Sequence, residues 1–203
     1  RGIRTAEQAQ AFLDPQKHIP APATDLPDLA AAADHLERAM AKRERIGVWG
    51  DFDVDGQTAT TLLVSALRRL GADVIYYIPV RGRESHGIAL PSLAAFLERG
   101  VRLLLTCDTG VGAHEAVNYA RSRQVTTLIT DHHTLPAELP PAEAVVNPQR
   151  LPLQHPLSGL CGVGCAYKLV EELYRRANRP QDLQQELDLV ALGTVADVAP
   201  LQG

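Results

Sequence analysis

Short apolar runs alternate with amphipathic segments along most of the chain. Five β-rich runs predict buried strands at residues 46–49, 74–78, 102–106, 127–130 and 144–146. Apolar residues at helical spacing predict helices at residues 5–13 (one short turn), 28–43, 57–70, 92–99, 113–122, 164–177 and 182–192. This alternation predicts an α/β fold, a doubly wound, mostly parallel sheet of about five strands with helices on both faces.

Acidic or imidazole side chains follow three of the expected strands. They are Asp51, Asp53 and Asp55 after the first strand, Asp108 after the third, and Asp131, His132 and His133 after the fourth. Because ligands bind outside the carboxyl ends of parallel strands, we expect these side chains to converge on one edge of the sheet. Like charges packed this densely need a cation to neutralise them, so the sequence predicts a metal site.

Carboxylates combined with a neutral imidazole suit Mn²⁺ or Mg²⁺ better than structural zinc, which favours thiolates. Asp53 and Asp55 are alternate residues, and we expect them to share one side of an extended or turning backbone. With Asp108 and His132 they provide enough ligands for two ions. Two metal ions can activate a water and hold both oxygens of an in-line displacement at phosphorus, so the site favours phosphoester hydrolysis.

Two other interpretations of these motifs are weaker. The stretch 51–56 begins like a calcium-binding EF-hand loop, but the twelfth position is Leu62 instead of glutamate, and a strand is expected before it. The Asp-Thr-Gly at 108–110 also occurs in aspartic proteases. Those enzymes are all-β and need a second such motif, which this sequence lacks.

The composition is that of an ordinary globular protein, with 45 % apolar and 22 % charged residues and a net charge of −4. No apolar stretch approaches the roughly 20 residues of a membrane span, and there is no signal-peptide pattern, so we expect a cytoplasmic protein without membrane contact. Cys107, Cys161 and Cys165 are too few for a disulfide framework. Cys161 and Cys165 could form half a zinc site, but no second pair follows, so packing is the favoured role.

These motifs together resemble the DHH phosphoesterase superfamily and, within it, the RecJ-type single-strand-specific exonucleases. The matching stretches are Gly-Asp-Phe-Asp-Val-Asp-Gly at 50–56, Thr-Cys-Asp-Thr-Gly at 106–110, Thr-Asp-His-His at 130–133, Leu-Ser-Gly at 157–159 with Gly-Val-Gly at 162–164, and Leu-Gly-Thr-Val-Ala-Asp-Val-Ala-Pro-Leu at 192–201. The resemblance implies an N-terminal extension with a lead-in helix at 1–44 and a DHH domain at 45–203. The family's second domain is absent from this chain, which starts at Arg1, and whether the chain is a fragment of a longer enzyme stays open.

The resemblance also implies a ligand set for two Mn²⁺ or Mg²⁺ ions, with Asp108 bridging them. That set is Asp53, Asp55, Asp108, His132 and Asp197. His133 is expected to contact the phosphate or to protonate the leaving oxygen, which makes Asp108 and His133 the expected catalytic residues. Many family members carry a histidine where this chain has Trp49. Either Asp51 takes over as a metal ligand, or one ion is held more loosely.

Arg81 and Arg83 lie in the expected loop after the second strand, where family members place an arginine near the mouth of the site. Either could neutralise a phosphate, although Arg83 could equally be a solvated loop charge. Ser158 and Gly159 precede an expected helix and could offer a hydroxyl and N–H groups to a phosphate, or simply form a cap. The remaining histidines are expected to be ordinary surface residues: His18, His35, His86, His114 and His155.

The function that the resemblance implies is the two-metal phosphodiesterase core of a 5′→3′ single-stranded DNA exonuclease in repair and recombination. Single-stranded DNA is the expected partner, with a single-strand-binding protein or a helicase as protein partners. Two alternatives stay open. One is a phosphodiesterase for short oligonucleotides, cyclic dinucleotides or pyrophosphate, and the other is a non-catalytic DHH-like scaffold.

Overall fold

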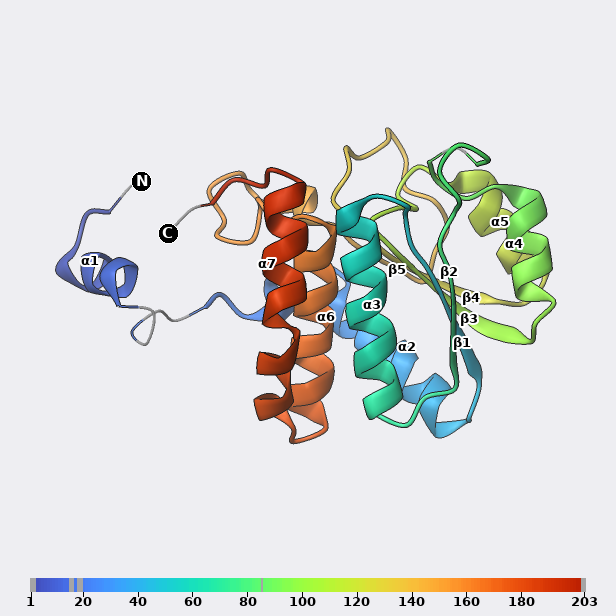
Figure 1. Ribbon diagram of the computed structural model, residues 1–203, viewed down its shortest axis with the longest axis horizontal. Helices are drawn as coiled ribbons and strands as arrows, with labels where there is room; N and C mark the ends of the chain where they lie inside the picture. Colours follow the sequence, from blue (N-terminus) through green and yellow to red (C-terminus); the bar gives the residue numbers. More distant parts are fainter. Residues whose placement is uncertain (1–2, 15–16, 18–19, 85, 202–203) are drawn as a thin grey trace.

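Five parallel strands form one sheet at the centre of the computed structural model (Figure 1). The structure describes residues 3–14, 17, 20–84 and 86–201. His18, expected at the surface, lies outside them. The strands are β1 (Arg45–Trp49), β2 (Val74–Tyr77), β3 (Val101–Cys107), β4 (Thr126–Thr130) and β5 (Ala144–Val146), in the order β2-β1-β3-β4-β5. The expected doubly wound α/β fold is therefore confirmed.

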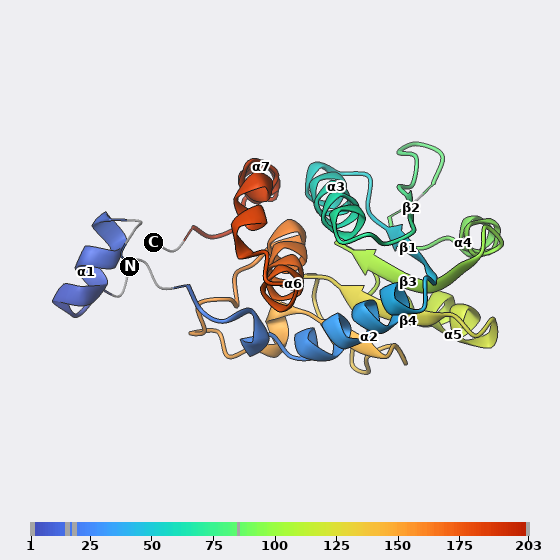
Figure 2. The same ribbon diagram turned by 90° about the horizontal axis from the view of Figure 1, so that it is seen from below.

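Helices cover both faces of the sheet (Figure 2). One face carries α2 (Leu29–Ala41), α3 (Val54–Arg69) and α6 (Gly162–Arg176), with α7 (Leu187–Ala196) packed against α3 and α6. The other face carries α4 (Leu90–Leu97) and α5 (His114–Ser122). The N-terminal helix α1 (Ala6–Leu13) stands apart from this α/β body in both views. Among the described residues, no helix combines the length and apolar character needed to cross a membrane.

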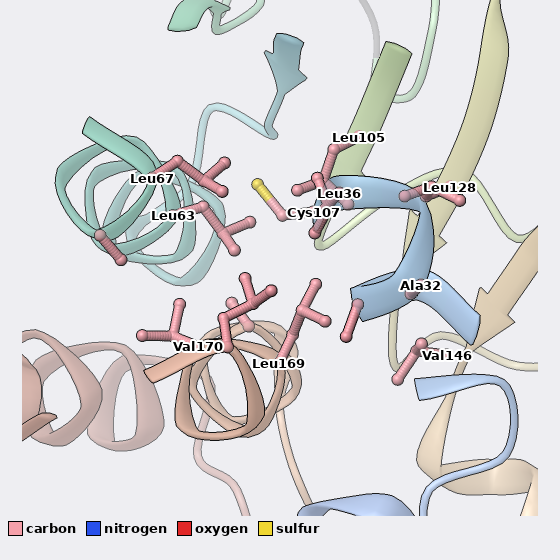
Figure 3. Close-up of a cluster of buried hydrophobic side chains, with 14 of the residues drawn as sticks. Ala32, Leu36, Leu63, Leu67, Leu105, Cys107, Leu128, Val146, Leu169 and Val170 are labelled. Carbon is pink, nitrogen blue, oxygen red and sulfur yellow. The ribbon is translucent and has the colours of Figure 1, made fainter. Parts of the chain in front are cut away.

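Side chains of the strands alternate between the two layers, as the pleat requires. In β1, Val48 points into the core under α2, α3 and α6, whereas Trp49 points into the core under α4 and α5. Figure 3 shows the first core, where Leu63 of α3 and Leu169 of α6 close over Cys107 of β3. Trp49 is fully buried and stacks on Tyr77, so it belongs to the second core.

Two details of the expected elements are wrong. The strand β2 was expected to be buried, but it is an edge strand whose Tyr76 is 51 % exposed. The expected helix at 182–192 is instead the 3₁₀ helix η4 (Pro180–Glu186) followed by α7. Directly before α2, the Asp28 carboxylate makes no hydrogen bond that caps the helix, because it accepts from the Val145 N–H and pairs with Arg150.

Candidate metal centre

The order of the strands places the site. The order of the strands reverses between β1 and β3, because β2 lies on one side of β1 whereas β3, β4 and β5 follow on the other side. Cys107 of β3 pairs with Thr130 of β4, so Asp108 and Asp131 follow adjacent strand ends. The N–H of Asp108 donates to the Thr130 oxygen at 3.0 Å. The backbone ladder itself thus fixes the relative position of these two acidic residues.

Asp108 is the most unusual member of the site. Its backbone is left-handed, with φ of +59°, and its side chain is 1 % exposed. His132 Nε2 lies 3.1 Å from Asp108 Oδ1, but no donor among the described residues meets hydrogen-bond geometry toward either carboxylate oxygen. Burial, followed by the nearby carboxylates of Asp55 and Asp53, raises the pKa of Asp108 to about 7. A buried carboxylate in these surroundings fits a divalent cation, which would supply the missing positive partner.

Asp55 joins two helices at the same point. It lies in the first turn of α3, is 3 % exposed, and accepts hydrogen bonds from the N–H groups of Gly162 at 2.6 Å and Val163 at 2.8 Å, where α6 begins. Burial raises the pKa of Asp55, while these two N–H groups oppose the shift. The positive end of α6 therefore helps this carboxylate to remain charged beside Asp108.

Asp55 and Asp53 do not share a face of an extended strand. The helix α3 begins at Val54, so Asp53 is its N-cap and accepts from the Gly56 N–H at 2.9 Å, whereas Asp55 lies inside the first turn. The expected helix start at residue 57 is wrong, because the helix begins three residues earlier, and the backbone therefore turns between Asp53 and Asp55. The functional consequence is that the two carboxylates differ, since one caps its own helix and the other links α3 to α6.

The atoms that could hold an ion form two groups, each with ligand atoms within 4.8 Å of one another. The first group is Asp108, His132 and His133, and the second is Asp55, Cys161 and Asp197. His132 connects them, because its Nε2 is 3.8 Å from Asp55 Oδ2 and its Nδ1 is 3.9 Å from Asp197 Oδ2. The unpartnered oxygens of Asp108 beside these groups fit a divalent cation held mainly by oxygen ligands with an imidazole.

Asp131 and His133 form a separate unit. The Asp131 carboxylate accepts from the N–H groups of His132 and His133 and from Nδ1 of His133 at 2.7 Å, while its other oxygen accepts from the Val111 N–H. Burial acts against the charged form of Asp131, but these donors outweigh it and lower its pKa. The same hydrogen bond raises the pKa of His133 to about 9. Asp131 thus orients a half-exposed imidazole toward the mouth of the site.

Asp51 is placed differently from the other carboxylates. It is 4 % exposed, accepts from the Phe52 N–H at 2.6 Å and pairs with Nδ1 of His86 at 3.0 Å, and it belongs to neither group of closely spaced ligand atoms. The exposed His86 also lies against the Phe52 ring. Arg81 stacks on Phe52 as well, with its guanidinium 4.7 Å from the ring centre. The contact between His86 and Asp51 depends on the fold of the loop, and no sequence motif predicted it.

The other expected substrate-binding residues lie in simpler surroundings. Arg83 is exposed in the same loop as Arg81. The Ser158 hydroxyl donates to the Leu153 oxygen at 2.9 Å, and Gly159 approaches Pro200. The helix α6 begins only at Gly162, and its first two N–H groups are taken by Asp55. These contacts give Ser158 a local role in closing its own loop.

Cys161 is a neighbour of the site that the sequence did not place beside the other candidate ligands. It precedes Gly162 and was assigned to packing, and it is a buried free thiol as expected. Its sulfur nevertheless shares the second group with Asp55 and Asp197. Burial raises the pKa of this thiol to about 11. The position directly before the matched Gly-Val-Gly stretch was the available signal.

Two hollows are lined by residues of this site. One, of about 870 Å³, is lined by residues that include Asp51, His86, His133 and residues 109–113. The other, of about 380 Å³, is lined by Phe52, Asp53, Val54, Asp55, Gln57, Arg81, Ala196 and Asp197. Asp51 and His133 therefore face one hollow, whereas Asp53, Asp55 and Asp197 face the other.

A doubly wound sheet with carboxylates and imidazoles at its switch point defines an α/β domain with a candidate divalent-metal centre. Residues 45–194 match the model of the DHH family, N-terminal domain. The chain belongs to this DHH family. The match spans β1 through most of α7 and includes both groups of candidate ligands except Asp197.

Relatives of this chain include proteins named single-stranded-DNA-specific exonuclease RecJ. The chain is 36 % identical to that of Bacillus subtilis (strain 168) over 201 residues and 41 % identical to that of Haemophilus influenzae over 179 residues. These matches cover 99 % and 84 % of the chain, but the chain spans only 25 % and 31 % of the relatives' lengths. A crystal structure of exonuclease RecJ bound to manganese is similar with a TM-score of 0.83 and 38 % identity, covering 91 % of this chain and 46 % of that one.

Proposed function

We propose that this chain is the metal-dependent phosphodiesterase core of a RecJ-like 5′→3′ exonuclease acting on single-stranded DNA. The observation that carries the proposal is Asp108, whose two buried carboxylate oxygens have no donor in the described part of the chain while His132 and Asp55 converge beside it. The exonuclease names of the relatives support the substrate, and the manganese in one similar structure supports the metal. A single-strand-binding protein or a helicase as partner is part of this proposal.

The proposed ligands of two Mn²⁺ or Mg²⁺ ions are Asp53, Asp55, Asp108, His132 and Asp197, with Asp108 between them and Asp51 as a further candidate. Bound ions would supply a nucleophilic water and neutralise charge on the phosphate oxygens. Asp197 is the C-cap residue of α7. The carbonyl end of a helix carries partial negative charge, so a cation bound there would be favoured by the helix as well as by the carboxylate. Asp53 and Asp55 lie at the opposite, positive end of α3, which offsets the repulsion among the carboxylates.

The proposed role of His133 is to contact the phosphate or to protonate the leaving oxygen. Asp131 holds its Nδ1 at 2.7 Å, so Nε2 is the nitrogen left to face substrate. A histidine with a raised pKa carries a proton at neutral pH and can donate it to an alkoxide as the P–O bond breaks. Arg81 lines the hollow that also contains Asp53, Asp55 and Asp197, where it could neutralise an incoming phosphate.

The test is hydrolysis of single-stranded DNA labelled at either end, with Mn²⁺, compared with duplex DNA, dinucleotides and pyrophosphate. We expect loss of nucleotides from the 5′ end of the single strand, and no release with Asp108→Asn. Asparagine is used because it tolerates the left-handed backbone at this position. Preference for dinucleotides or pyrophosphate would instead favour the small-substrate alternative, and failure of the chain to bind Mn²⁺ in calorimetry would favour the non-catalytic scaffold.

A further inference from the structure

The loop between β2 and α4 lies over the stretch that leads from β1 into the site. Arg81 stacks on Phe52, and the His86 ring lies 4.1 Å from the same ring. His86 also pairs with Asp51 at 3.0 Å. The loop therefore contacts two consecutive residues, Asp51 and Phe52, which directly precede the proposed ligand Asp53.

The carboxylate of Glu84 joins the loop to its neighbours through hydrogen bonds. Its two oxygens accept from the Tyr77 hydroxyl at 2.9 and 2.8 Å, from the Ser92 hydroxyl at 2.5 Å and from the Val80 N–H at 3.0 Å. Tyr77 ends β2 and Ser92 lies in the first turn of α4, so one side chain connects the loop to both flanking elements. These donors favour the charged carboxylate, and the Ser92 hydroxyl and the Val80 N–H are the main causes of the lowered pKa of Glu84.

Glu84 does not itself face the proposed ligands. A backbone bridge joins it to Arg81, and the Val80 oxygen accepts from both the Arg83 and the Glu84 N–H groups at 3.0 Å. This tight turn presents Arg81 on the side of the hollow that contains Asp53 and Asp197. A carboxylate with several donors is hard to replace by an amide, because an amide turns one acceptor into a donor.

We propose that Glu84 is a positioning residue, which holds the loop so that Arg81 stands at the mouth of the site and meets the phosphate of an incoming DNA strand. This inference rests on the proposed function. It assigns to Glu84 an effect on substrate capture that is exerted through Arg81, and no direct part in the chemistry.

The test compares Glu84→Gln with the matched control Glu98→Gln, since Glu98 is exposed at the end of the neighbouring α4. With Mn²⁺ and a 5′-phosphorylated oligothymidylate, we expect Glu84→Gln to raise KM about tenfold and to change kcat by less than about twofold. Binding of the same oligonucleotide in Ca²⁺, measured by fluorescence anisotropy, should weaken by the same factor. Glu98→Gln should leave both measurements unchanged.

A double-mutant cycle with Arg81→Ala separates this role from general destabilisation. If Glu84 acts through Arg81, Glu84→Gln adds little to Arg81→Ala, whereas independent effects would multiply and would overturn the inference. Ser92→Ala and Tyr77→Phe each remove one donor and should shift KM in the same direction by a smaller factor, even if Glu84→Gln folds poorly. An unchanged KM in Glu84→Gln would overturn the inference and leave the proposed function standing. A wild-type chain without Mn²⁺-dependent hydrolysis would overturn both.

Discussion

Asp55 and Gly162 are joined by a 2.6 Å hydrogen bond from the backbone N–H of Gly162 to Oδ2 of Asp55. This bond ties the first turn of α3 to the first turn of α6 at the point where the proposed metal ligands meet. One carboxylate thus serves two purposes, because it satisfies N–H groups that a helix start leaves open and it faces the neighbouring Asp108 and His132. We therefore expect stability and metal binding to be coupled through Asp55.

This double role predicts that Asp55→Asn destabilises the protein even without a metal. The amide still offers an oxygen, but its NH₂ group faces one of the two N–H donors of α6. We expect a loss of about 1–3 kcal/mol in the free energy of unfolding, measured by urea denaturation in EDTA. Loss of Mn²⁺ binding in calorimetry should accompany it. An unchanged urea midpoint would contradict the structural role.

Asp108 and Asp131 are both buried, but replacing each by asparagine should affect the stability of the protein in opposite ways. Asp108→Asn removes an unpartnered buried charge, so the melting temperature in EDTA should stay the same or rise, while the stabilisation by Mn²⁺ should disappear. Asp131→Asn disturbs a carboxylate that accepts four hydrogen bonds, and should cost about 2 kcal/mol with or without Mn²⁺. Equal destabilisation by both variants would show that Asp108 is not poised for a cation.

Gly162 leaves room for the Asp108 side chain. A Cβ at Gly162 would lie 2.5 Å from Asp108 Oδ1, whereas a Cβ at Gly112 would meet nothing within 4 Å. Gly162→Ala should therefore displace the carboxylate and weaken Mn²⁺ binding at least about tenfold, and Gly112→Ala should bind Mn²⁺ like the wild type. Calorimetric titration of both variants checks this. Equal affinities would mean that Asp108 can move aside without losing its function.

Glu172 should govern part of the stability in acid. It is 3 % exposed and paired with Arg175 at 2.8 Å and with Arg176 at 2.6 Å. Its hydrogen bonds with Arg175, and then with Arg176, lower its pKa to about 2, from an ordinary value of 4.5. Because the folded pKa is the lower one, the stabilisation is complete above about pH 5 and is lost as the pH falls toward 2.

The matching experiment is urea unfolding of wild type and Glu172→Gln between pH 2.5 and 7. We expect the variant to be less stable by about 2 kcal/mol at pH 7 and the difference to shrink as the solution becomes acidic. Glu171→Gln is the control, because Glu171 pairs with Lys168 on the same helix and has no such arginine pair. A constant difference across the pH range would assign the loss to packing.

The sequence by itself determined the class of fold and the identity of the candidate ligands. Apolar runs of strand length between amphipathic segments specify a parallel α/β sheet, because each pattern can bury its apolar side in only one way. The rule that parallel strands end at a common edge was enough to predict that Asp55, Asp108 and His132 meet. In the structure, His132 Nε2 lies 3.1 Å from Asp108 and 3.8 Å from Asp55.

Only the tertiary structure decided how these side chains differ. Asp55 is held by the start of a helix that follows about a hundred residues later, Asp108 is left without donors, and Asp51 is paired with His86 of a loop. The same holds for β2, which became an edge strand, and for Asp28, which binds β5 instead of capping its helix. Hydrogen bonds between segments that are distant in the sequence determine these differences. A local pattern of residues does not specify which distant donor a carboxylate will bind.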